Sequence, residues 1–306
     1  MRIAVLGMGR MGRAVAGRLL AGGHEVAVWN RSPGKADDLA GQGATDRSGQ
    51  PASGAVDGAE VAITSLSDDA AVRAVVIDAG VAGALTRTAA GGTTTILVDM
   101  STVSPDTSRQ LARAVGEQGF VASPVLASPA GVASGEALYL IAGAAEPRRA
   151  LTPVFATLSG RRVELGEDPG TALVVKLLSN ALLLSGIAVL GEMVATARAA
   201  GLDDDFLRQF LGSSPLVAPA LRNRLDNMIS GRHAGWFTTA LGAKDARLAE
   251  DVALGHGLRP PLIAAVRQRY QEAAAEGWAD EDLTAVIELM RRPHGSAASG
   301  PARHEA

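Results

Sequence analysis

The first thirty residues contain the pattern that most constrains the fold. The apolar run RIAVLG leads directly into GMGRMG, a G-x-G-x-x-G loop with glycines at Gly7, Gly9 and Gly12, and a helix-forming segment follows. These glycines allow a tight turn, a close approach of the backbone to a pyrophosphate and close packing of the helix on the strand. A second apolar run, EVAVWN, ends about 20 residues further on, as a βαβ nucleotide-binding unit requires. The pattern predicts a dinucleotide-binding loop; the alternative is a glycine-rich turn that binds no ligand.

Further short apolar runs alternate with helix-like segments as far as Gly166: VAITSL, ILVDMS, FVASPV, LYLIAG and RRVELG. This alternation predicts an α/β Rossmann domain with a mostly parallel, doubly wound sheet over residues 1–165. From Thr171 to about Arg291 the pattern is helical, with breaks at GLDDD, SSPLVAP, SGRHAG and GLRPP. We therefore expect an all-α C-terminal domain over 166–293, entered by a long interdomain helix, and a disordered tail over 294–306.

Composition excludes several classes of function. The chain has 306 residues, 47% of them apolar, and a net charge of −3, so it lacks the basic footprint of a nucleic-acid-binding protein and any attraction to anionic membranes. Without cysteine there is no disulfide, thiolate nucleophile or zinc-thiolate site. The five histidines are scattered, and neither G-x-S-x-G nor H-E-x-x-H occurs, so neither a metal site nor a hydrolase is expected. The apolar stretch before Arg10 is too short to serve as a signal segment, so no targeting segment and a cytoplasmic location are expected.

Lys176 is unusual because it lies in the apolar helical run GTALVVKLLSNALLLSGIAVLGEM. A buried ammonium is costly, so this side chain either extends to water or faces a cleft. Asn180 follows one helical turn later, on the same face. The run from Asn180 to Gly191 is shorter than the roughly 18 residues of a membrane span, and we expect a buried helix without membrane contact.

The residues after the second strand favour NADP(H) over NAD(H). Asn30 stands where a carboxylate would bind the ribose 2′-hydroxyl, and Arg31, Ser32 and Lys35 follow. A guanidinium and a hydroxyl can bind a 2′-phosphate that a carboxylate would repel. The alternative is a solvated Arg31 that stacks on the adenine of either cofactor.

Several motifs in order resemble one family: GMGRMG, WNRS, SLSDDAAV, DMSTVSP, PGTALVVKLLSN and FTTALGAKDARLA. From Met1 to about Met290 the chain is similar to the β-hydroxyacid dehydrogenases, which include 3-hydroxyisobutyrate dehydrogenase and the glyoxylate/succinic semialdehyde reductases. Imine reductases share this fold and much of the pattern. The resemblance implies hydride transfer between NADP(H) and a small carbonyl or hydroxy compound, in an active site in the interdomain cleft beside Lys176. It also implies a homodimer or homotetramer, which the long apolar helix favours as well.

The resemblance also assigns roles to residues. Lys176 is expected to protonate the developing alkoxide in reduction and, when neutral, to accept the proton in oxidation. The expected catalytic residues are Lys176, Asn180 and Ser101. The expected cofactor-binding residues are Gly7, Met8, Gly9, Arg10, Met11, Gly12, Asn30, Arg31, Ser32, Lys35, Leu66, Ser67, Thr102, Phe237 and Lys244. Two alternatives remain: Ser101 and Thr102 as helix caps, and Lys244 with Asp245 as a solvated surface pair.

The expected substrate-binding residues are Ser101, Leu126, Ala127, Ser128, Lys176 and Asn180. The family's Asp-Ala-Pro-Val-Ser-Gly-Gly segment, which holds the substrate carboxylate, is here Ala122 to Ser128, with Leu126 in place of a hydroxyl. The change indicates a larger or less polar substrate and keeps an imine reductase as the alternative. Against it, imine reductases commonly carry aspartate or tyrosine at the position of Lys176, and a cationic lysine would repel an iminium. A non-catalytic NADP-binding protein is the second alternative.

Overall fold

The computed structural model describes residues 1–90 and 95–291, and the chain divides after Lys176 into two compact units. The first extends from Met1 to Lys176, and the second begins at Leu177. Each unit is described by itself below. The tail predicted to be disordered, residues 294–306, lies outside the described residues.

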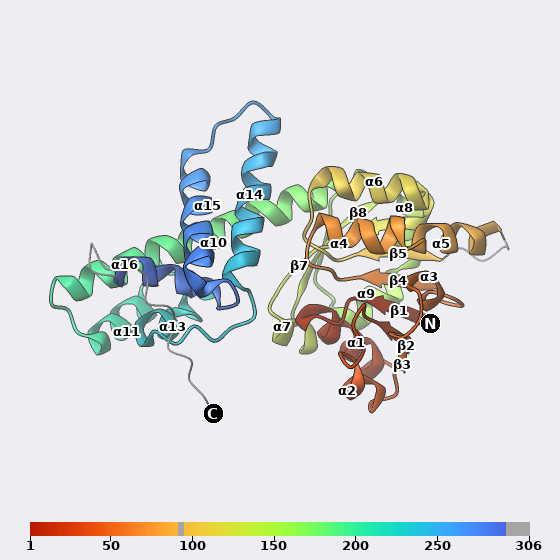
Figure 1. The fold of residues 1–306 in the computed structure, drawn as a ribbon, viewed down its shortest axis with the longest axis horizontal. Helices are drawn as coiled ribbons and strands as arrows, with labels where there is room; N and C mark the ends of the chain where they lie inside the picture. The colour runs from red at the N-terminus through yellow and green to blue at the C-terminus, as the bar shows by residue number, and fades with distance from the viewer. Residues whose placement is uncertain (91–94, 292–306) are drawn as a thin grey trace. The chain divides into compact units, whose positions relative to one another are not determined.

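The first unit is built on one twisted sheet with the strand order β3-β2-β1-β4-β5-β6-β8-β7, and β9 pairs with β8 (Figure 1). Neighbouring strands from β3 to β6 run parallel, and β8 runs antiparallel to β6 and β7. The strands are β1 (Arg2–Leu6), β2 (Glu25–Trp29), β3 (Thr45–Asp46), β4 (Val61–Thr64), β5 (Ile96–Asp99), β6 (Phe120–Ala122), β7 (Val125–Leu126), β8 (Leu138–Gly143) and β9 (Arg162–Glu164). This arrangement confirms the predicted Rossmann sheet.

Helices cover both faces of this sheet (Figure 1). They are α1 (Arg10–Ala21), α2 (Asp37–Ala40), α3 (Ala52–Ala55), α4 (Asp69–Arg73) with a π-helical turn (Ala74–Asp78), α5 (Val81–Ala90), α6 (Pro105–Val115), a 3₁₀ turn (Glu117–Gly119), α7 (Pro129–Ala133), α8 (Ala145–Ala150) and α9 (Thr152–Leu158). Along β1, Ile3 and Val5 pack into the core beneath α1, α7 and α9, whereas Ala4 and Leu6 pack beneath α3 to α6. Burial of both faces explains why the central strands β1, β4, β5 and β6 are mostly apolar, whereas β3 and β9 are polar and exposed.

Within the described residues, every secondary-structure element of the second unit is helical, apart from an isolated bridge between Thr238 and Asp282, which confirms the predicted all-α half. Its elements are α10 (Pro169–Ala199), which begins in the first unit, α11 (Asp204–Ser213), α12 (Pro219–Arg222), α13 (Leu225–Ser230), α14 (Thr239–Gly255), α15 (Pro261–Ala273), a π-helical turn (Ala274–Trp278), a 3₁₀ turn (Leu283–Ile287) and α16 (Glu288–Arg291). Gly231 ends α13 in a left-handed conformation, and Pro261 begins α15, so glycine and proline mark two of the predicted breaks.

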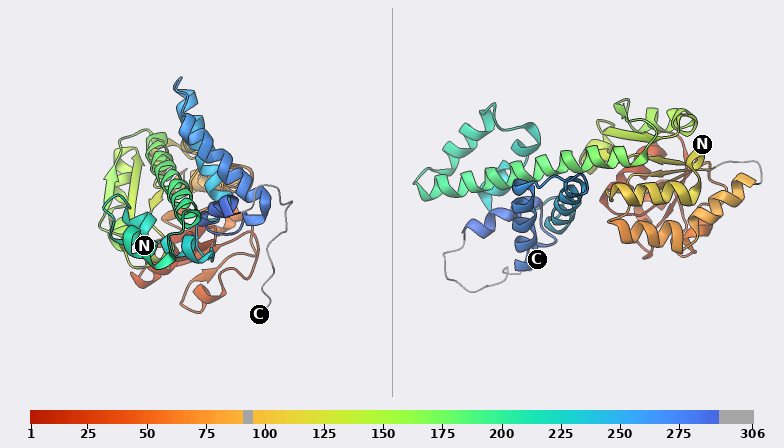
Figure 2. Two further views of the ribbon diagram at one scale, coloured as in Figure 1. Left: turned by 90° about the vertical axis from the view of Figure 1, so that its left-hand side faces the viewer. Right: turned by 90° about the horizontal axis from the view of Figure 1, so that it is seen from above.

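Helix α10 is one continuous element of 31 residues (Figure 2). By length and composition alone it qualifies as a membrane-crossing helix, but the core helix of a soluble protein meets the same criteria. The apolar run from Asn180 to Gly191, judged too short for a membrane span, is thus only the middle of a longer helix. Burial is also incomplete: Leu184 and Ile187 lie in the core of the second unit, whereas Leu182 is largely exposed.

Candidate active site

The glycine loop has the geometry that its sequence predicts. Gly7 has a φ of +104°, and a Cβ on Gly12 would lie 1.9 Å from the carbonyl oxygen of Gly7. Around Gly9, by contrast, no atom lies within 4 Å of an added Cβ. The loop is therefore tightly packed on the protein side and open at Gly9, the N-cap of α1, and these residues fit the pyrophosphate of a dinucleotide at a helix N-terminus.

Asn30 organises this loop instead of merely replacing a carboxylate. Its Oδ1 accepts a hydrogen bond from the Met8 backbone N–H at 3.1 Å, and its Nδ2 donates to the Ser32 carbonyl at 2.9 Å. The segment from Arg31 to Lys35 is also held from α1, because Arg13 Nη1 donates to the Lys35 carbonyl at 2.5 Å. The side chains of Arg31, Ser32 and Lys35 are exposed on this anchored segment. They are available to an anion beside the glycine loop.

The loops that follow β4 and β5 are connected by a buried carboxylate, Asp99, which the sequence did not reveal. Asp99 Oδ1 accepts from Thr64 Oγ1 at 2.8 Å and from the Ser101 N–H at 3.1 Å, and Ser101 Oγ accepts from the Leu66 N–H at 2.9 Å. Asp99 is fully buried, and its Oδ2 has no hydrogen-bond partner among the described residues. Burial raises the pKa of Asp99 to about 6, although hydrogen bonds from Ser101 and Thr64 oppose the rise. The only sequence signal was the Asp of DMST, directly at the strand end.

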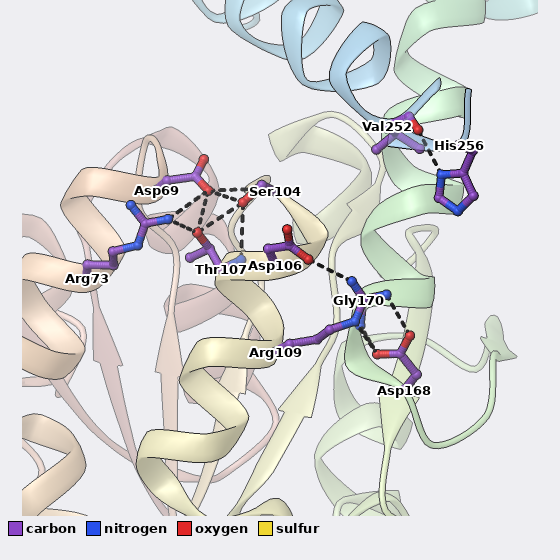
Figure 3. Close-up of polar contacts among 10 residues, drawn as sticks. All are labelled: Asp69, Arg73, Ser104, Asp106, Thr107, Arg109, Asp168, Gly170, Val252 and His256. Atoms are coloured by element: carbon purple, nitrogen blue, oxygen red, sulfur yellow. Dashed lines mark hydrogen bonds and ion pairs between the residues drawn. The ribbon is translucent and has the colours of Figure 1, made fainter. Parts of the chain in front are cut away.

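A second carboxylate ties the helices that follow these strands (Figure 3). Asp69, the first residue of α4, accepts from the Ser104 N–H at 3.0 Å, from Ser104 Oγ at 2.5 Å and from Thr107 Oγ1 at 2.6 Å. Burial raises the pKa of Asp69, but these hydrogen bonds and Arg73 outweigh it, and the pKa lies below its ordinary value.

The cap of α6 is Ser104, whose Oγ accepts from the Thr107 N–H at 3.2 Å. The alternative that Ser101 or Thr102 caps this helix is therefore wrong. The loops that contain Leu66, Ser67, Ser101 and Thr102 are instead held together as one surface at the carboxyl edge of the sheet, where open α/β folds bind ligands.

Lys176 lies at the end of the first unit, half-buried, and its Nζ donates to the Val125 carbonyl at 2.7 Å. Leu126 and Ala127 follow Val125 directly, and both pack against the cores of the sheet. Ser128 Oγ accepts from the Gly131 N–H at 3.0 Å as the cap of α7, so one of its lone pairs is already used. The segment that holds the Lys176 amine is thus mostly apolar.

In the second unit, Asn180 is buried and its Nδ2 donates to Asp245 Oδ2 at 2.6 Å. Lys244 Nζ lies 3.0 Å from Asp245 Oδ1, and both side chains are largely buried, so the alternative of a solvated surface pair is wrong. A carboxylate can only accept hydrogen bonds, so the NH₂ group of Asn180 must face Asp245. The amide oxygen Oδ1 therefore points away from Asp245, where it can accept a hydrogen bond from another group. Asp245 is therefore a site residue that the sequence analysis named only as the neighbour of Lys244.

Phe237 is buried in the same unit and stacks on Trp236, with ring centroids 5.7 Å apart and planes 22° from parallel. Its backbone is fixed by the Leu283 N–H, which donates to the Phe237 carbonyl. The structure thus places this ring on a rigid turn just before α14, the helix that carries Lys244.

Comparisons with protein families match almost the whole chain. Residues 2–166 match the NAD binding domain of 6-phosphogluconate dehydrogenase. Residues 170–290 match a family described as NAD-binding of NADP-dependent 3-hydroxyisobutyrate dehydrogenase.

Curated relatives align over nearly their full length. The uncharacterized oxidoreductase YfjR of Bacillus subtilis is 32% identical over 296 residues, which cover 95% of this chain and 100% of that protein. Glyoxylate/succinic semialdehyde reductase 1 of Arabidopsis thaliana is 30% identical over 293 residues, covering 95% and 99%.

Solved structures of two kinds of enzyme resemble the chain. Mycobacterium tuberculosis 3-hydroxyisobutyrate dehydrogenase, studied with L-serine, has a TM-score of 0.79 and 26% identity and covers 95% of this chain and 99% of its own. An imine reductase of Streptomyces aurantiacus has a TM-score of 0.62 and 25% identity, with 95% and 100% covered.

Proposed function

Because the chain belongs to the β-hydroxyacid dehydrogenase family, a family of pyridine-nucleotide-dependent oxidoreductases, we propose that it transfers hydride between NADP(H) and a small carbonyl or hydroxy compound. The observation that carries the proposal is the Lys176 amine, held by the Val125 carbonyl in an otherwise apolar helix. A panel of aldehydes, keto acids and cyclic imines, assayed with NADPH and with NADH, tests it. NADPH-dependent reduction of carbonyls supports the proposal, whereas turnover of imines alone contradicts it.

In the proposed mechanism the bound nicotinamide supplies or accepts the hydride, and the protein handles the proton. The Lys176 ammonium is oriented by its hydrogen bond to the Val125 carbonyl, and in this mechanism it binds and protonates a developing alkoxide. In oxidation the neutral amine accepts the proton of the hydroxyl. Asn180 lies one turn further along α10, and the hydrogen bond of its Nδ2 to Asp245 leaves Oδ1 to serve as an acceptor for a substrate in the proposed mechanism. Ser101, whose position is fixed by its hydrogen bonds with Asp99 and Leu66, would contact the nicotinamide when the cofactor is bound.

The proposed preference for NADP(H) rests on the anchored segment from Arg31 to Lys35. We expect Arg31→Ala to raise the KM for NADPH by about tenfold to fiftyfold, because a charge-assisted hydrogen bond to the 2′-phosphate is lost. The KM for NADH should change little, and Arg113→Ala, an exposed arginine on α6, serves as the control. Equal losses with both cofactors would instead indicate an arginine that stacks on adenine.

The imine reductase is retained as the second candidate because Leu126 and Ala127, which follow Val125 in the segment that holds Lys176, carry apolar side chains where the resemblance expects a hydroxyl and a glycine. Leu126→Ser is expected to raise kcat/KM for carboxylate-bearing aldehydes over uncharged ones by about threefold to tenfold, the effect of one added hydrogen bond. Leu126→Ala is the matched control, because it removes the same bulk without adding a hydroxyl. If both variants change selectivity equally, the size of Leu126 decides it. Cofactor binding without turnover of any substrate would favour a non-catalytic NADP-binding protein.

We also propose a cytoplasmic homodimer or homotetramer. Exposed apolar side chains on α10 support the association: Leu178, Leu182, Val189 and Met193. Absence of cysteine is compatible with a reducing compartment. Sedimentation velocity of the full chain measures the oligomeric state, and a monomer at micromolar concentration would contradict this part of the proposal.

A further inference from the structure

Helix α10 begins at a carboxylate cap. Asp168 Oδ1 accepts from the Gly170 N–H at 2.9 Å, and the Asp168 carbonyl accepts from the Thr171 N–H at 3.1 Å. Pro169 occupies the first helical position, where its missing N–H costs no hydrogen bond. An aspartate cap followed by proline defines the residue at which a helix starts. The start of α10 is thus defined locally, seven residues before Lys176 ends the first unit.

The Asp168 cap is also bound by the guanidinium of Arg109, which lies on α6 (Figure 3). Arg109 of α6 donates through Nε to Asp168 Oδ1 at 3.0 Å and through Nη2 to Asp168 Oδ2 at 2.8 Å, while Nη1 donates to Asp106 Oδ1 at 2.9 Å. The hydrogen bond from Arg109 is the main reason that the pKa of Asp168 lies below its ordinary value, and the same bond raises the pKa of Arg109. A two-pronged arginine–carboxylate pair fixes orientation as well as distance.

Gly170 makes room for this grip. A Cβ at this position would lie 2.6 Å from the guanidinium carbon of Arg109, so any larger residue would push the arginine aside. Glycine is a poor helix former, and its presence in the first turn is explained by the close approach of the guanidinium. Asp168, Arg109 and Gly170 therefore act together, and we call these three residues the clamp. We call the pair of hydrogen bonds from the Arg109 guanidinium to the Asp168 carboxylate the fork.

The clamp connects two parts of the candidate site. At its start α6 is held by its Ser104 cap and by Asp69, directly after the loop that contains Ser101 and Thr102. One turn later the same helix carries Arg109, which holds the start of α10. Lys176 lies six residues beyond Gly170, about 9 Å along the helix axis at 1.5 Å per residue. A short, rigid path thus leads from the Ser101 loop to the Lys176 amine, all within the first unit.

We propose that Arg109 is a positioning residue that, through Asp168, sets the start of α10 and thereby the place at which the Lys176 amine meets the Val125 carbonyl. The proposal rests on the proposed function only for the effect on turnover. Without the fork, the first turn of α10 loses its lateral support, since the first N–H groups of a helix have no partner within the helix. The hydrogen bond from Lys176 to the Val125 carbonyl is then formed for a smaller fraction of the time. The amine is therefore less often in the geometry that proton transfer requires.

The test uses the full chain and variants that separate the fork from the cap. Arg109→Gln removes the charged fork, Arg109→Lys keeps the charge but not the two-pronged geometry, and Asp168→Asn keeps an oxygen for the Gly170 N–H but weakens the pair. Arg149→Gln is the matched control, because Arg149 forms an exposed helical ion pair with Glu146 on α8. At saturating cofactor we expect kcat to fall about threefold to tenfold in Arg109→Gln and Asp168→Asn and less in Arg109→Lys, with the Kd for NADPH unchanged.

Two further readouts do not depend on turnover. Hydrogen exchange of peptides within 169–178 should accelerate in Arg109→Gln, and acylation of Lys176 by a small amine-reactive ester, followed by mass spectrometry, should become at least threefold faster. Unchanged exchange and unchanged acylation overturn the proposal even if the wild type reduces no carbonyl. Faster exchange with unaltered acylation and kcat also overturns it, because the clamp would then be structural only. A wild type that is inactive on every substrate, with both readouts altered, contradicts the proposed function and supports the clamp.

Discussion

Replacing Lys176 by methionine is expected to lower kcat for NADPH-dependent carbonyl reduction by at least about a hundredfold, the usual contribution of a general acid. Methionine keeps the unbranched shape and the helix propensity of lysine, so α10 should still pack on the first unit. It removes the amine that donates to the Val125 carbonyl and, in the proposed mechanism, to the developing alkoxide. Steady-state oxidation of NADPH at saturating aldehyde measures the effect.

Lys176→Arg separates charge from proton transfer. Arginine keeps a cation at this position but does not give up its proton at working pH, so an electrostatic role would survive in this variant and a general-acid role would not. We expect both variants to bind NADPH with the wild-type Kd, because the glycine loop and Arg31 are untouched. Unimpaired turnover in Lys176→Met would make Lys176 a bystander and overturn the assignment.

The fold was predictable because its signals are local and repeated. Each predicted run up to Gly166 contains a strand, and the central runs are mostly apolar because both faces of the sheet are covered by helices, whereas RRVELG forms an exposed edge strand. The strand Thr45–Asp46 was missed, since two exposed residues at the sheet edge leave no periodic pattern. The end of α15 was also not predicted in detail: a π-helical turn and Gly277, at a φ of +99°, interrupt a segment whose composition is still helical.

The sequence identified candidate site residues where a rare residue type stands in an unusual position. The glycines of the loop and the lysine of an apolar helix are rare enough in their positions to be informative without neighbours. The carboxylates were not, because Asp69, Asp99, Asp168 and Asp245 resemble surface residues in the sequence and acquire their roles from partners distant along the chain. Asp99 and Thr64, for example, are 35 positions apart, and only the pairing of β4 with β5 brings them together. For Asn30, the sequence did indicate a position in the cofactor site. Its hydrogen bonds with Met8 and Ser32 could not be predicted, because they depend on the folded conformation of the loop.

Asp99→Asn is expected to change how the stability of the first unit depends on pH. The pKa of Asp99 is raised from 3.8 to about 6 in the folded chain, so the folded state binds its proton more tightly than the unfolded state does. The stabilisation from this proton is fully present below about pH 4 and is lost as pH rises through about 6, a change on the order of 3 kcal/mol in the free energy of unfolding. Asparagine stays neutral throughout and retains an oxygen for Thr64 and the Ser101 N–H. Between pH 4.5 and pH 8 the wild type should therefore lose about 2 kcal/mol relative to this variant.

Tryptophan fluorescence can follow the first unit alone, because Trp29 lies in β2 whereas Trp236 and Trp278 lie in the second unit. Denaturant unfolding in a Trp236→Phe, Trp278→Phe background, repeated from pH 4.5 to 8, gives the difference between wild type and Asp99→Asn at each pH. Asp78→Asn, an exposed carboxylate in the same unit, is the control and should follow the wild type in parallel. If the curve of Asp99→Asn is also parallel, the carboxyl group titrates as it does in the unfolded chain. The position of Asp99 would then be determined by its hydrogen bonds alone. The hydrogen bond that holds Ser101 would not change in strength with pH.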